Sequence, residues 1–449
     1  MVSTYLRDCA RIFRLGLPVL VSQLGTIVVG FADNMMVGHY STDALASASF
    51  VNNLFNLPIF AAMGFSYGLT PLVGALFTNG RADKIGQVLR AGVLVNILVS
   101  LLLMAVMGAV YLNLDLLGQP EQLLPIIRPY FIIYMAGMLP ICVFNAFAQW
   151  SYGIRNTALP MWIMLAANLL NILGNYLLIY GNFGAPELGL TGAGISTLTA
   201  RILCALAICW VFFRAAKYRD YAAGYHRGRP SGDVYGNVVR MSWPVSLQMS
   251  FETAAFSGCA LMCGWIGAVE MAAFQIVVIV GMFGFCIYYA MATSVAVLVA
   301  NEAGRNDAAG MRRQAFAGYG VILACCTLSS LFFGLGSSKV MSIFTDDPAV
   351  LAAAVGVILP LVLYQVGDAT QINFANALRG TGNVRPMMWI AFVSYILVGL
   401  PSSYLLAFPG GMGFYGIILS FSCSLFLAAF LFLHFFMRTV RRAGQPDPE

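Results

Sequence analysis

Long apolar blocks separated by short polar loops are the feature that most constrains this chain. The blocks run for about 20–30 residues, the length that a helix needs to cross ~30 Å of hydrocarbon. Hydrophobic residues fill 60% of the 449 positions and charged residues only 9%, whereas a soluble chain carries about 25% charge. Because unpaired backbone groups are costly in lipid, spanning segments of this length are helical. The sequence therefore predicts an all-α integral membrane protein.

Twelve such segments are predicted, six in each half of the chain. They are 15–38, 50–77, 88–114, 126–152, 159–181, 190–215, 238–264, 270–302, 311–335, 349–378, 385–408 and 412–438. All but three of the 24 basic residues fall on one side of these segments, together with both chain ends. Since Lys and Arg concentrate in cytoplasmic loops, both termini are expected in the cytoplasm. This one-sided distribution also accounts for the net charge of +6 without a nucleic-acid partner.

The two halves repeat each other at a nearly constant offset. A shift of 226 residues lays Arg14-Leu-Gly-Leu-Pro18 on Arg240-Met-Ser-Trp-Pro244. A shift of 224 lays Gly80-Arg-Ala-Asp83 on Gly304-Arg-Asn-Asp307. Six helices per repeat give both repeats the same membrane orientation, so the axis that relates them lies along the membrane normal.

The duplication predicts two six-helix lobes around a central cleft. We expect an amino-terminal lobe at 1–215, a basic cytoplasmic linker at 216–237, and a carboxy-terminal lobe with a short basic tail at 238–449. Rocking one lobe against the other would expose the cleft to either side of the membrane, which is alternating access.

Three acidic residues lie inside otherwise apolar segments of membrane length: Asp33, Glu252 and Asp368. An ionised acid at the centre of a membrane helix costs roughly 2.5–3.5 kcal/mol on insertion scales. Such residues usually bind cations, protons or charged substrates. The structural alternatives are an acid near the interface for Asp33, and a buried pair for Glu252 and Asp368. The three acids together predict a transporter.

Helical spacing places further groups beside the acid of the seventh segment. Gln248 lies one turn before Glu252 and Phe256 one turn after it, so amide, carboxylate and ring share a face. An aromatic ring near a carboxylate suits an organic cation. Gln248, Glu252 and Phe256 are therefore candidate substrate-binding residues.

The acid of the tenth segment has similar neighbours. Tyr364, Gln365 and Gln371 lie within one turn of Asp368. Carboxylate, amide and hydroxyl oxygens are the ligands that a hard cation such as Na⁺ requires. We expect Tyr364, Asp368 and Gln371 to contact substrate, and Glu252 with Asp368 to be candidate Na⁺ ligands.

Polar residues also cluster in the fifth and sixth segments. Asn171 and Asn175 are four apart and stack on one helical face, and Thr197 follows in the next segment. One interpretation makes these three residues neutral oxygen ligands around Asp33. The other is interhelical hydrogen bonding, worth roughly 0.6 kcal/mol for each bond in membranes. Arg201 is interpreted as a counter-ion or as a residue that snorkels along a cleft.

The motifs of phosphate-binding loops, His-rich metal sites and nucleophile elbows are not found in the sequence. Cys259 and Cys263 share a helical face, but no His or second Cys pair accompanies them, so a metal site is not expected there. We therefore expect no enzyme activity and no cofactor. An ion gradient, rather than ATP used directly, is the predicted energy source.

The order of these motifs resembles that of the MATE multidrug and toxin extrusion exporters, in the bacterial NorM-like branch. The similarity covers about residues 10 to 438. It rests on Pro18, Gly30-Phe-Ala-Asp33, Val37-Gly38, Leu170-Asn-Ile-Leu-Gly-Asn175, Ile179-Tyr-Gly181, Glu252, Tyr364-Gln-Val-Gly-Asp368 and Ala377-Leu-Arg-Gly380.

The resemblance implies export of cationic or amphipathic drugs in exchange for inward Na⁺ or H⁺, by a monomer in the bacterial inner membrane. Asp33 matches the family's amino-lobe acid, and Glu252 and Asp368 match carboxy-lobe acids of the NorM-like branch. Some relatives carry a second acid where this chain has Asn175, so the coupling ion stays open between Na⁺ and H⁺. The alternatives are a lipid-linked oligosaccharide flippase, which needs a basic cavity, and a sodium symporter.

Overall fold

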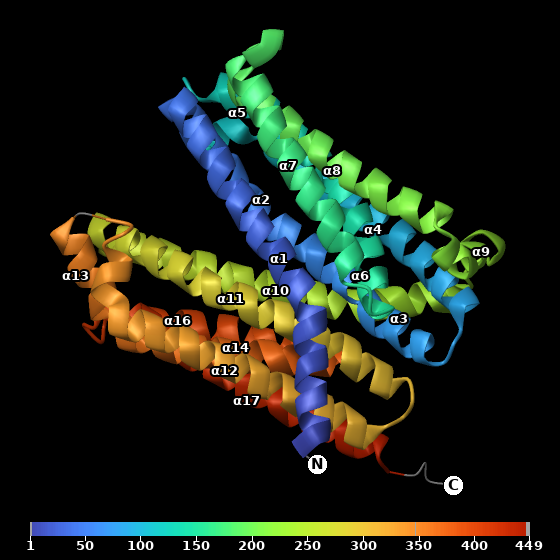
Figure 1. Ribbon diagram of the computed structural model, residues 1–449. Helices are drawn as coiled ribbons and strands as arrows, with labels where there is room; N and C mark the ends of the chain where they lie inside the picture. The colour runs from blue at the N-terminus through green and yellow to red at the C-terminus, as the bar shows by residue number, and fades with distance from the viewer. Residues whose placement is uncertain (1, 346, 446–449) are drawn as a thin grey trace. The chain divides into compact units, whose positions relative to one another are not determined.

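The computed structural model describes residues 2–345 and 347–445, and every regular element in those ranges is a helix (Figure 1). Ten of the described helices are long and apolar enough to cross a membrane, or eleven if the bent pair α13–α14 forms one span. The predicted segment 238–264 lies in α10, a helix of 35 residues that is not among them. The all-α membrane fold predicted from the sequence is confirmed. Residues 1, 346 and 446–449 of the predicted lobes lie outside the described residues.

The first half of the chain contains the helices that form the amino-terminal site. They are α1 (Val2–Tyr40), α2 (Thr42–Tyr67), α3 (Leu69–Thr78), α4 (Ala82–Leu112), α5 (Leu124–Ala136), α6 (Met138–Gly153), α7 (Ala158–Tyr180), α8 (Gly189–Arg214) and α9 (Arg219–Arg227). Short turns η1 (Leu114–Leu117), η2 (Asn182–Gly184) and η3 (Ala216–Tyr218) join some of them.

The second half contains longer helices and two irregular spans. Its elements are α10 (Gly232–Ile266), α11 (Ala268–Ala303), α12 (Ala308–Met341), α13 (Pro348–Gly356), α14 (Ile358–Gly380), α15 (Arg385–Ala391), η4 (Phe392–Gly399), α16 (Leu400–Ala407) and α17 (Gly413–Ala443). A bend of 50° separates α13 from α14. The η4 segment is a π-helix between α15 and α16, a feature that often marks functional sites.

The described chain forms two compact units. The amino-terminal unit runs from Val21 to Ser246, and the carboxy-terminal unit combines the residues before Val21 with those from Leu247 onward. These contacts group the start of α1 with the second half of the chain, whereas the sequence places residues 1–20 in the first lobe. In each repeat the chain changes unit just after a proline inside a helix, Pro18 in α1 and Pro244 in α10.

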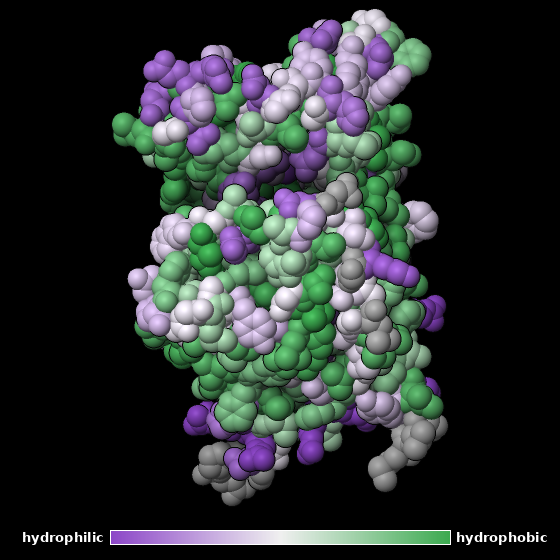
Figure 2. Space-filling view, turned by 90° about the vertical axis from the view of Figure 1, so that its left-hand side faces the viewer, coloured by the Kyte–Doolittle hydropathy of each residue, from purple (hydrophilic) through white to green (hydrophobic). Residues whose placement is uncertain are grey.

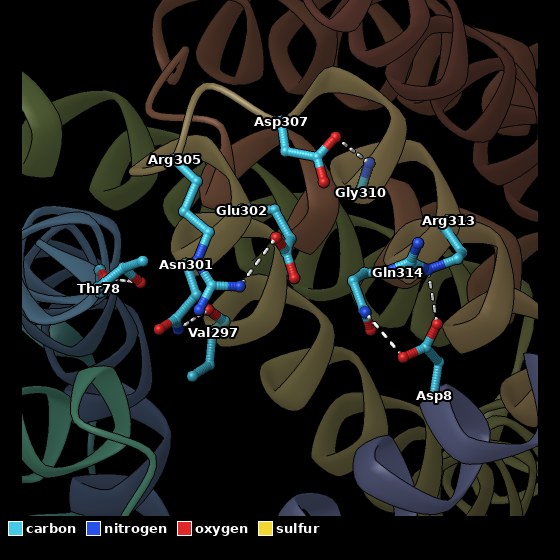
Figure 3. A network of polar contacts seen from close by, with 11 residues as sticks. Asp8, Thr78, Val297, Asn301, Glu302, Arg305, Asp307, Gly310, Arg313 and Gln314 are labelled. Carbon is cyan, nitrogen blue, oxygen red and sulfur yellow. Dashed lines mark hydrogen bonds and ion pairs between the residues drawn. The ribbon is translucent and has the colours of Figure 1, made fainter. Parts of the chain in front are cut away.

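Side-chain contacts explain why the start of α1 belongs to the carboxy-terminal unit. Asp8 is only 3% exposed, and its carboxylate accepts hydrogen bonds from Arg313 Nε at 2.8 Å and Gln314 Nε2 at 3.0 Å, both on α12 (Figure 3). A buried carboxylate requires such partners. The Asp8 network therefore ties the first part of α1 to α12.

The start of α10 is held in the amino-terminal unit by close packing on α2. A Cβ atom on Gly68 would lie 2.5 Å from Ser242 Oγ, so only glycine permits this approach. The hydroxyl of Ser246 donates a hydrogen bond to the carbonyl of Ala61 at 2.7 Å. The first part of α10 is thus a structural part of the amino-terminal unit rather than of the second lobe.

The predicted linker, residues 216–237, contains the short turn η3, the packed helix α9 and the first residues of α10. Arg90 on α4 donates hydrogen bonds to the carbonyls of Tyr225 at 3.4 Å and Gly228 at 3.2 Å, and α9 lies against the end of α4 in Figure 1. Trp150 is fully buried and contacts Phe212 of α8 and Tyr221 of α9 edge-on. This aromatic cluster joins α9 to the core of the amino-terminal unit.

Large apolar side chains are exposed along the helices of both units. Trp162, Trp210, Trp389 and Phe430 are among them, and hydrophobic residues cover much of the face shown in Figure 2. Exposed apolar surface on this scale is unfavourable in water but suits contact with lipid. The surface and the helix lengths together describe a multi-pass membrane protein.

Candidate functional site

The amino-terminal site is centred on Asp33, near the end of α1. Asn175 of α7 donates a hydrogen bond to Asp33 Oδ1. The side-chain amide of Asn171 is oriented with its nitrogen toward Asp33 and its oxygen toward Thr197. It donates a hydrogen bond to Asp33 Oδ1 at 3.0 Å and accepts one from the hydroxyl of Thr197 at 3.1 Å. Because α7 and α8 pack side by side, Thr197 of α8 completes this chain of hydrogen bonds (Figure 1). The structure therefore brings together all four residues predicted for this site.

A cavity of about 310 Å³ lies beside these residues, within the amino-terminal unit. Asp33, Asn171 and Thr197 line it together with Tyr130 and Tyr134 of α5. The two tyrosine rings lie 5.8 Å apart between centroids. Sequence analysis missed both tyrosines, because no spacing within α5 points to α1. The cavity combines a carboxylate, amides and aromatic rings, which are groups that bind cations.

Arg201 of α8 lines the same cavity as Asp33. Its guanidinium lies over the ring of Tyr134, 4.6 Å from the centroid. The cavity therefore contains both signs of charge, where the sequence analysis expected a counter-ion or a snorkelling residue.

The carboxy-terminal site contains two carboxylates, Glu252 on α10 and Asp368 on α14. Phe256, one turn after Glu252, and Tyr364, one turn before Asp368, lie 6.3 Å apart between ring centroids, so the two acids belong to one site. Gln248 lies one turn before Glu252 in the continuous helix α10, so the two side chains share a face. Asp368 is 2% exposed, and its Oδ2 atom has no hydrogen-bond partner among the described residues. Unpaired buried oxygens of this kind favour a bound proton or cation.

Aromatic rings pack around the two carboxylates. Phe421 of α17 lies 4.5 Å from Phe256 and is stacked on Tyr364 at 5.9 Å between centroids. Tyr395 of η4 is also stacked on Phe421, at 6.5 Å. Sequence analysis named Phe256 and Tyr364 but missed Phe421 and Tyr395, because these come from segments far along the chain.

A hydrogen-bond network lies next to Asp368. Gln365 Oε1 accepts hydrogen bonds from Tyr288 at 2.9 Å and from Ser329 at 3.0 Å. The two hydroxyls also bond each other at 2.7 Å. In the sequence, the only indication of this network was that Gln365 lies within one turn of Asp368. That spacing could not identify Tyr288 on α11 and Ser329 on α12 as the partners of Gln365.

The predicted site residues thus fall into two groups, one in each unit. Asp33, Asn171, Asn175 and Thr197 form the first. The second group shares the carboxy-terminal unit and consists of Gln248, Glu252, Phe256, Tyr364, Asp368 and Gln371. The described residues include no cluster of three or more His, Cys, Asp or Glu side chains that could hold a metal ion. The two carboxylates of the second group remain predicted Na⁺ ligands.

Comparison with protein-family models identifies one family. The model described as MatE matches residues 18–177 and again 244–405. The two matches begin 226 residues apart, which is the offset that the sequence repeats indicate. The family model therefore recognises each half of the chain as one copy of the same unit.

A relative in Geobacillus kaustophilus (strain HTA426), named "Probable multidrug resistance protein NorM", is 30% identical over 437 residues. The match covers 96% of this chain and 95% of the relative. The two proteins are therefore similar over nearly their whole lengths.

Two solved structures have the same fold. One is the eukaryotic MATE transporter AtDTX14, with a TM-score of 0.85, 17% identity and coverage of 98% of both chains. The other is a MOP superfamily transporter from Pyrococcus furiosus, with a TM-score of 0.86, 17% identity and coverage of 98% of this chain and 97% of its own. The binding pocket of this second transporter has reverse polarity, which suggests a different function for it. At 17% identity the similarity shows only a shared fold. The charge of the sites in this chain follows from its own residues.

Proposed function

Because this chain belongs to the MatE family, we propose that it is a multidrug efflux transporter, which exports cationic and amphipathic drugs in exchange for Na⁺ or H⁺. The observation that carries the proposal is the placement of carboxylates within apolar helices in both units. Asp33 lines a cavity with two tyrosines, and Glu252 and Asp368 lie among stacked aromatic rings. A relative named as a multidrug resistance protein supports the same assignment.

The geometry suggests competition between drug and coupling ion for the carboxylates. A carboxylate beside an aromatic ring attracts an organic cation through charge and through the ring face. A proton or Na⁺ that neutralises the same carboxylate removes the first of these attractions. An ion gradient moves a substrate only if the two ligands bind two states differently. Competition at Asp33, Glu252 and Asp368 provides this difference.

In the amino-terminal unit, Asn171 and Asn175 hold Asp33 in position through their amide nitrogens. Asn175 Oδ1, which has no partner among the described residues, would supply a neutral oxygen. In the carboxy-terminal unit, Glu252 and Asp368 would share a proton or Na⁺, because two nearby charges repel and one bound cation relieves the repulsion. Gln248 and Gln371 would complete the ligand set with amide oxygens. Na⁺ fits the pair of carboxylates better, and H⁺ fits the single Asp33 better.

The remaining parts of the proposal concern the whole molecule. The protein would act as a monomer in the bacterial inner membrane, with both termini in the cytoplasm. Its two six-helix lobes would rock about a central cleft and expose it alternately to the two sides. The distribution of Lys and Arg supports this orientation.

A lipid-linked oligosaccharide flippase would need a basic cavity for pyrophosphate. In this chain Asp33 shares the amino-terminal cavity with Arg201, and the carboxy-terminal site has two acids. Acids near a pyrophosphate would repel it. The two acids of the carboxy-terminal site therefore favour the efflux transporter.

Export assays on Glu252→Gln and Asp368→Asn test the proposal. Each variant removes one charge with little change of shape, and each should abolish ethidium efflux from energised vesicles while protein levels stay normal. A sodium jump and a proton jump, imposed separately on the wild type, would identify the coupling ion.

The matched control is Glu121→Gln, the same change at an exposed acid outside the spanning helices, which should leave efflux unchanged. Normal export by both site variants would contradict the assignment of these acids. Absence of wild-type efflux under either gradient would contradict the proposed transporter and favour the flippase.

A further inference from the structure

Phe183 is the most exposed large apolar side chain among the described residues, at 92%. It lies in η2, the short turn between α7 and α8. Its backbone is left-handed, with φ 57°, a conformation that bulky residues rarely adopt. Both the exposure and the backbone conformation are unfavourable for a phenylalanine surrounded by water. A residue this unfavourable in a surface turn indicates a contact outside the protein.

The η2 turn is fixed against the end of α7 by hydrogen bonds and by a ring contact. The side-chain amide of Asn182 donates to the carbonyl of Tyr176 at 3.0 Å. The backbone N–H of Leu188 donates to the carbonyl of Leu178 at 2.9 Å. The ring of Phe183 lies beside that of Tyr176, with the centroids 6.5 Å apart. The turn therefore folds back over the end of α7 and presents the Phe183 ring from a defined surface.

Phe183 continues an exposed stripe of side chains along α7. The members of this stripe recur at helical spacing and are Trp162, Leu169, Leu173 and Tyr176. The opposite face of α7 is buried and carries Asn171 and Asn175, which bond Asp33. Because α7 is long and apolar enough to span a membrane, its exposed apolar stripe faces lipid. The ring contact with Tyr176 makes Phe183 the end of this lipid-facing surface.

The length of α7 indicates the depth at which Phe183 meets the membrane. The 23 residues of α7 rise by ~35 Å at 1.5 Å per residue, against ~30 Å of hydrocarbon. Phe183 comes three residues after the end of the helix, and Trp162, which is 66% exposed, lies near its start. Exposed aromatic rings at both ends of a spanning helix are typical of the aromatic belts at the two membrane interfaces.

We propose that Phe183 and Tyr176 form a membrane anchor, which docks the η2 turn on the bilayer between the phospholipid headgroups and the first acyl carbons. The partner is lipid rather than another protein, because the Phe183 ring continues the lipid-facing stripe of α7. Insertion of the ring into this region removes it from water and so offsets its exposure and its strained backbone. The anchor is independent of the proposed efflux function.

Site-specific photocrosslinking tests the anchor on the purified full chain in vesicles of phosphatidylethanolamine and phosphatidylglycerol. In one variant p-benzoylphenylalanine replaces Phe183, and under ultraviolet light this probe reacts with nearby C–H bonds. Mass spectrometry should find a phospholipid adduct that is attached at the glycerol or at the first acyl carbons. The same probe in place of Leu173, which lies deeper on the exposed stripe, should attach further along the acyl chains.

The matched control places the probe at Glu121, an exposed residue in a polar turn of the same unit. Because water surrounds this position, it should give about tenfold less lipid adduct than position 183, a ratio that burial of one aromatic ring can provide.

Equal lipid yields at positions 183 and 121 would overturn the proposal. An adduct between position 183 and a second copy of the chain, in place of lipid, would also overturn it and would indicate a contact between copies. If the probe at position 183 prevents folding, the same probe in place of Tyr176 decides by the same comparison with Glu121.

Discussion

The two polar sites come from one duplicated framework but differ in chemistry. The amino-terminal site has one carboxylate, held by amides in a cavity that also contains an arginine. The carboxy-terminal site has two carboxylates among stacked aromatic rings. The repeat offset of 226 residues places Asp33 opposite Cys259, Glu252 opposite Thr26 and Asp368 opposite Cys142. None of the three acids has an acidic counterpart in the other repeat.

The two repeats therefore share the residues that shape their helices but differ in the residues that would bind ligands. Pro18 and Pro244 correspond, and both lie where the chain changes unit. Proline inside a helix kinks it, so a helix with the same kink in both repeats requires a proline at the same position. The acids bind ligands, and two halves with different acids can bind different ligands. We therefore expect the two sites to respond differently to substitution.

Outside the acid pair, the largest effect on export is expected from Asp33→Asn. The amino-terminal site has no second carboxylate to replace the lost charge, so the export rate should fall by about two orders of magnitude, as when a buried charge partner is removed. The asparagine can still accept from Asn171 and Asn175, so folding should be preserved. Efflux rate and protein level in the same vesicles measure both effects.

Cys259→Ser tests the equivalent position of the other repeat. Because Cys259 contacts only Ser403 among the described hydrogen bonds, this control should export normally. If Asp33→Asn exported as well as the wild type, Glu252 and Asp368 alone would drive transport. The expectation that Asp33 is needed in its own site would then be wrong.

A large effect on stability is expected from Phe421→Ala. Phe421 is 5% exposed and contacts the rings of Phe256, Tyr364 and Tyr395. Removing a buried phenylalanine costs about 3–5 kcal/mol, so the Tm of the purified protein should drop clearly. Phe430→Ala, at a ring that is 65% exposed on the same helix, is the matched control. An equal loss of Tm in both variants would show that the packing of Phe421 on the neighbouring rings does not stabilise the carboxy-terminal site.

A smaller effect is expected from Asn171→Ala, which removes one donor to Asp33 but keeps Asn175. Interhelical hydrogen bonds in membranes contribute roughly 0.6 kcal/mol, so the half-maximal concentration of the coupling ion should shift by about threefold. Asn113→Ala, at an exposed asparagine outside the cavity, should not shift it. A fall in export rate as large as that expected for Asp33→Asn would make Asn171 an essential ligand rather than one of two supports.

Within a single helix, sequence spacing placed the site residues well. Asn171 and Asn175 were predicted to stack on one face, and both contact Asp33. Gln248 was predicted to lie beside Glu252, and the two residues are one turn apart in the continuous helix α10. Spacing succeeds here because the helical repeat alone decides which side chains share a face.

Contacts between distant helices could not be derived in this way. Tyr130 and Tyr134 in the cavity wall, and Phe421 beside the acid pair, are aromatic residues in segments full of similar residues. Nothing local distinguishes a ring that faces lipid from one that faces a site. The assignment of the first part of α1 to the carboxy-terminal unit depended likewise on the buried contacts of Asp8.

The sequence by itself determined that this protein crosses a membrane as helices, that its halves are repeats, and which acids lie at membrane depth. Each of these follows from the hydrophobicity, length and order of residues along the chain. Tertiary structure decided which neutral and aromatic groups surround each acid, and that Arg201 shares a cavity with Asp33. The reason is physical: the affinity of a site depends on groups that different helices bring together, and packing sets that arrangement.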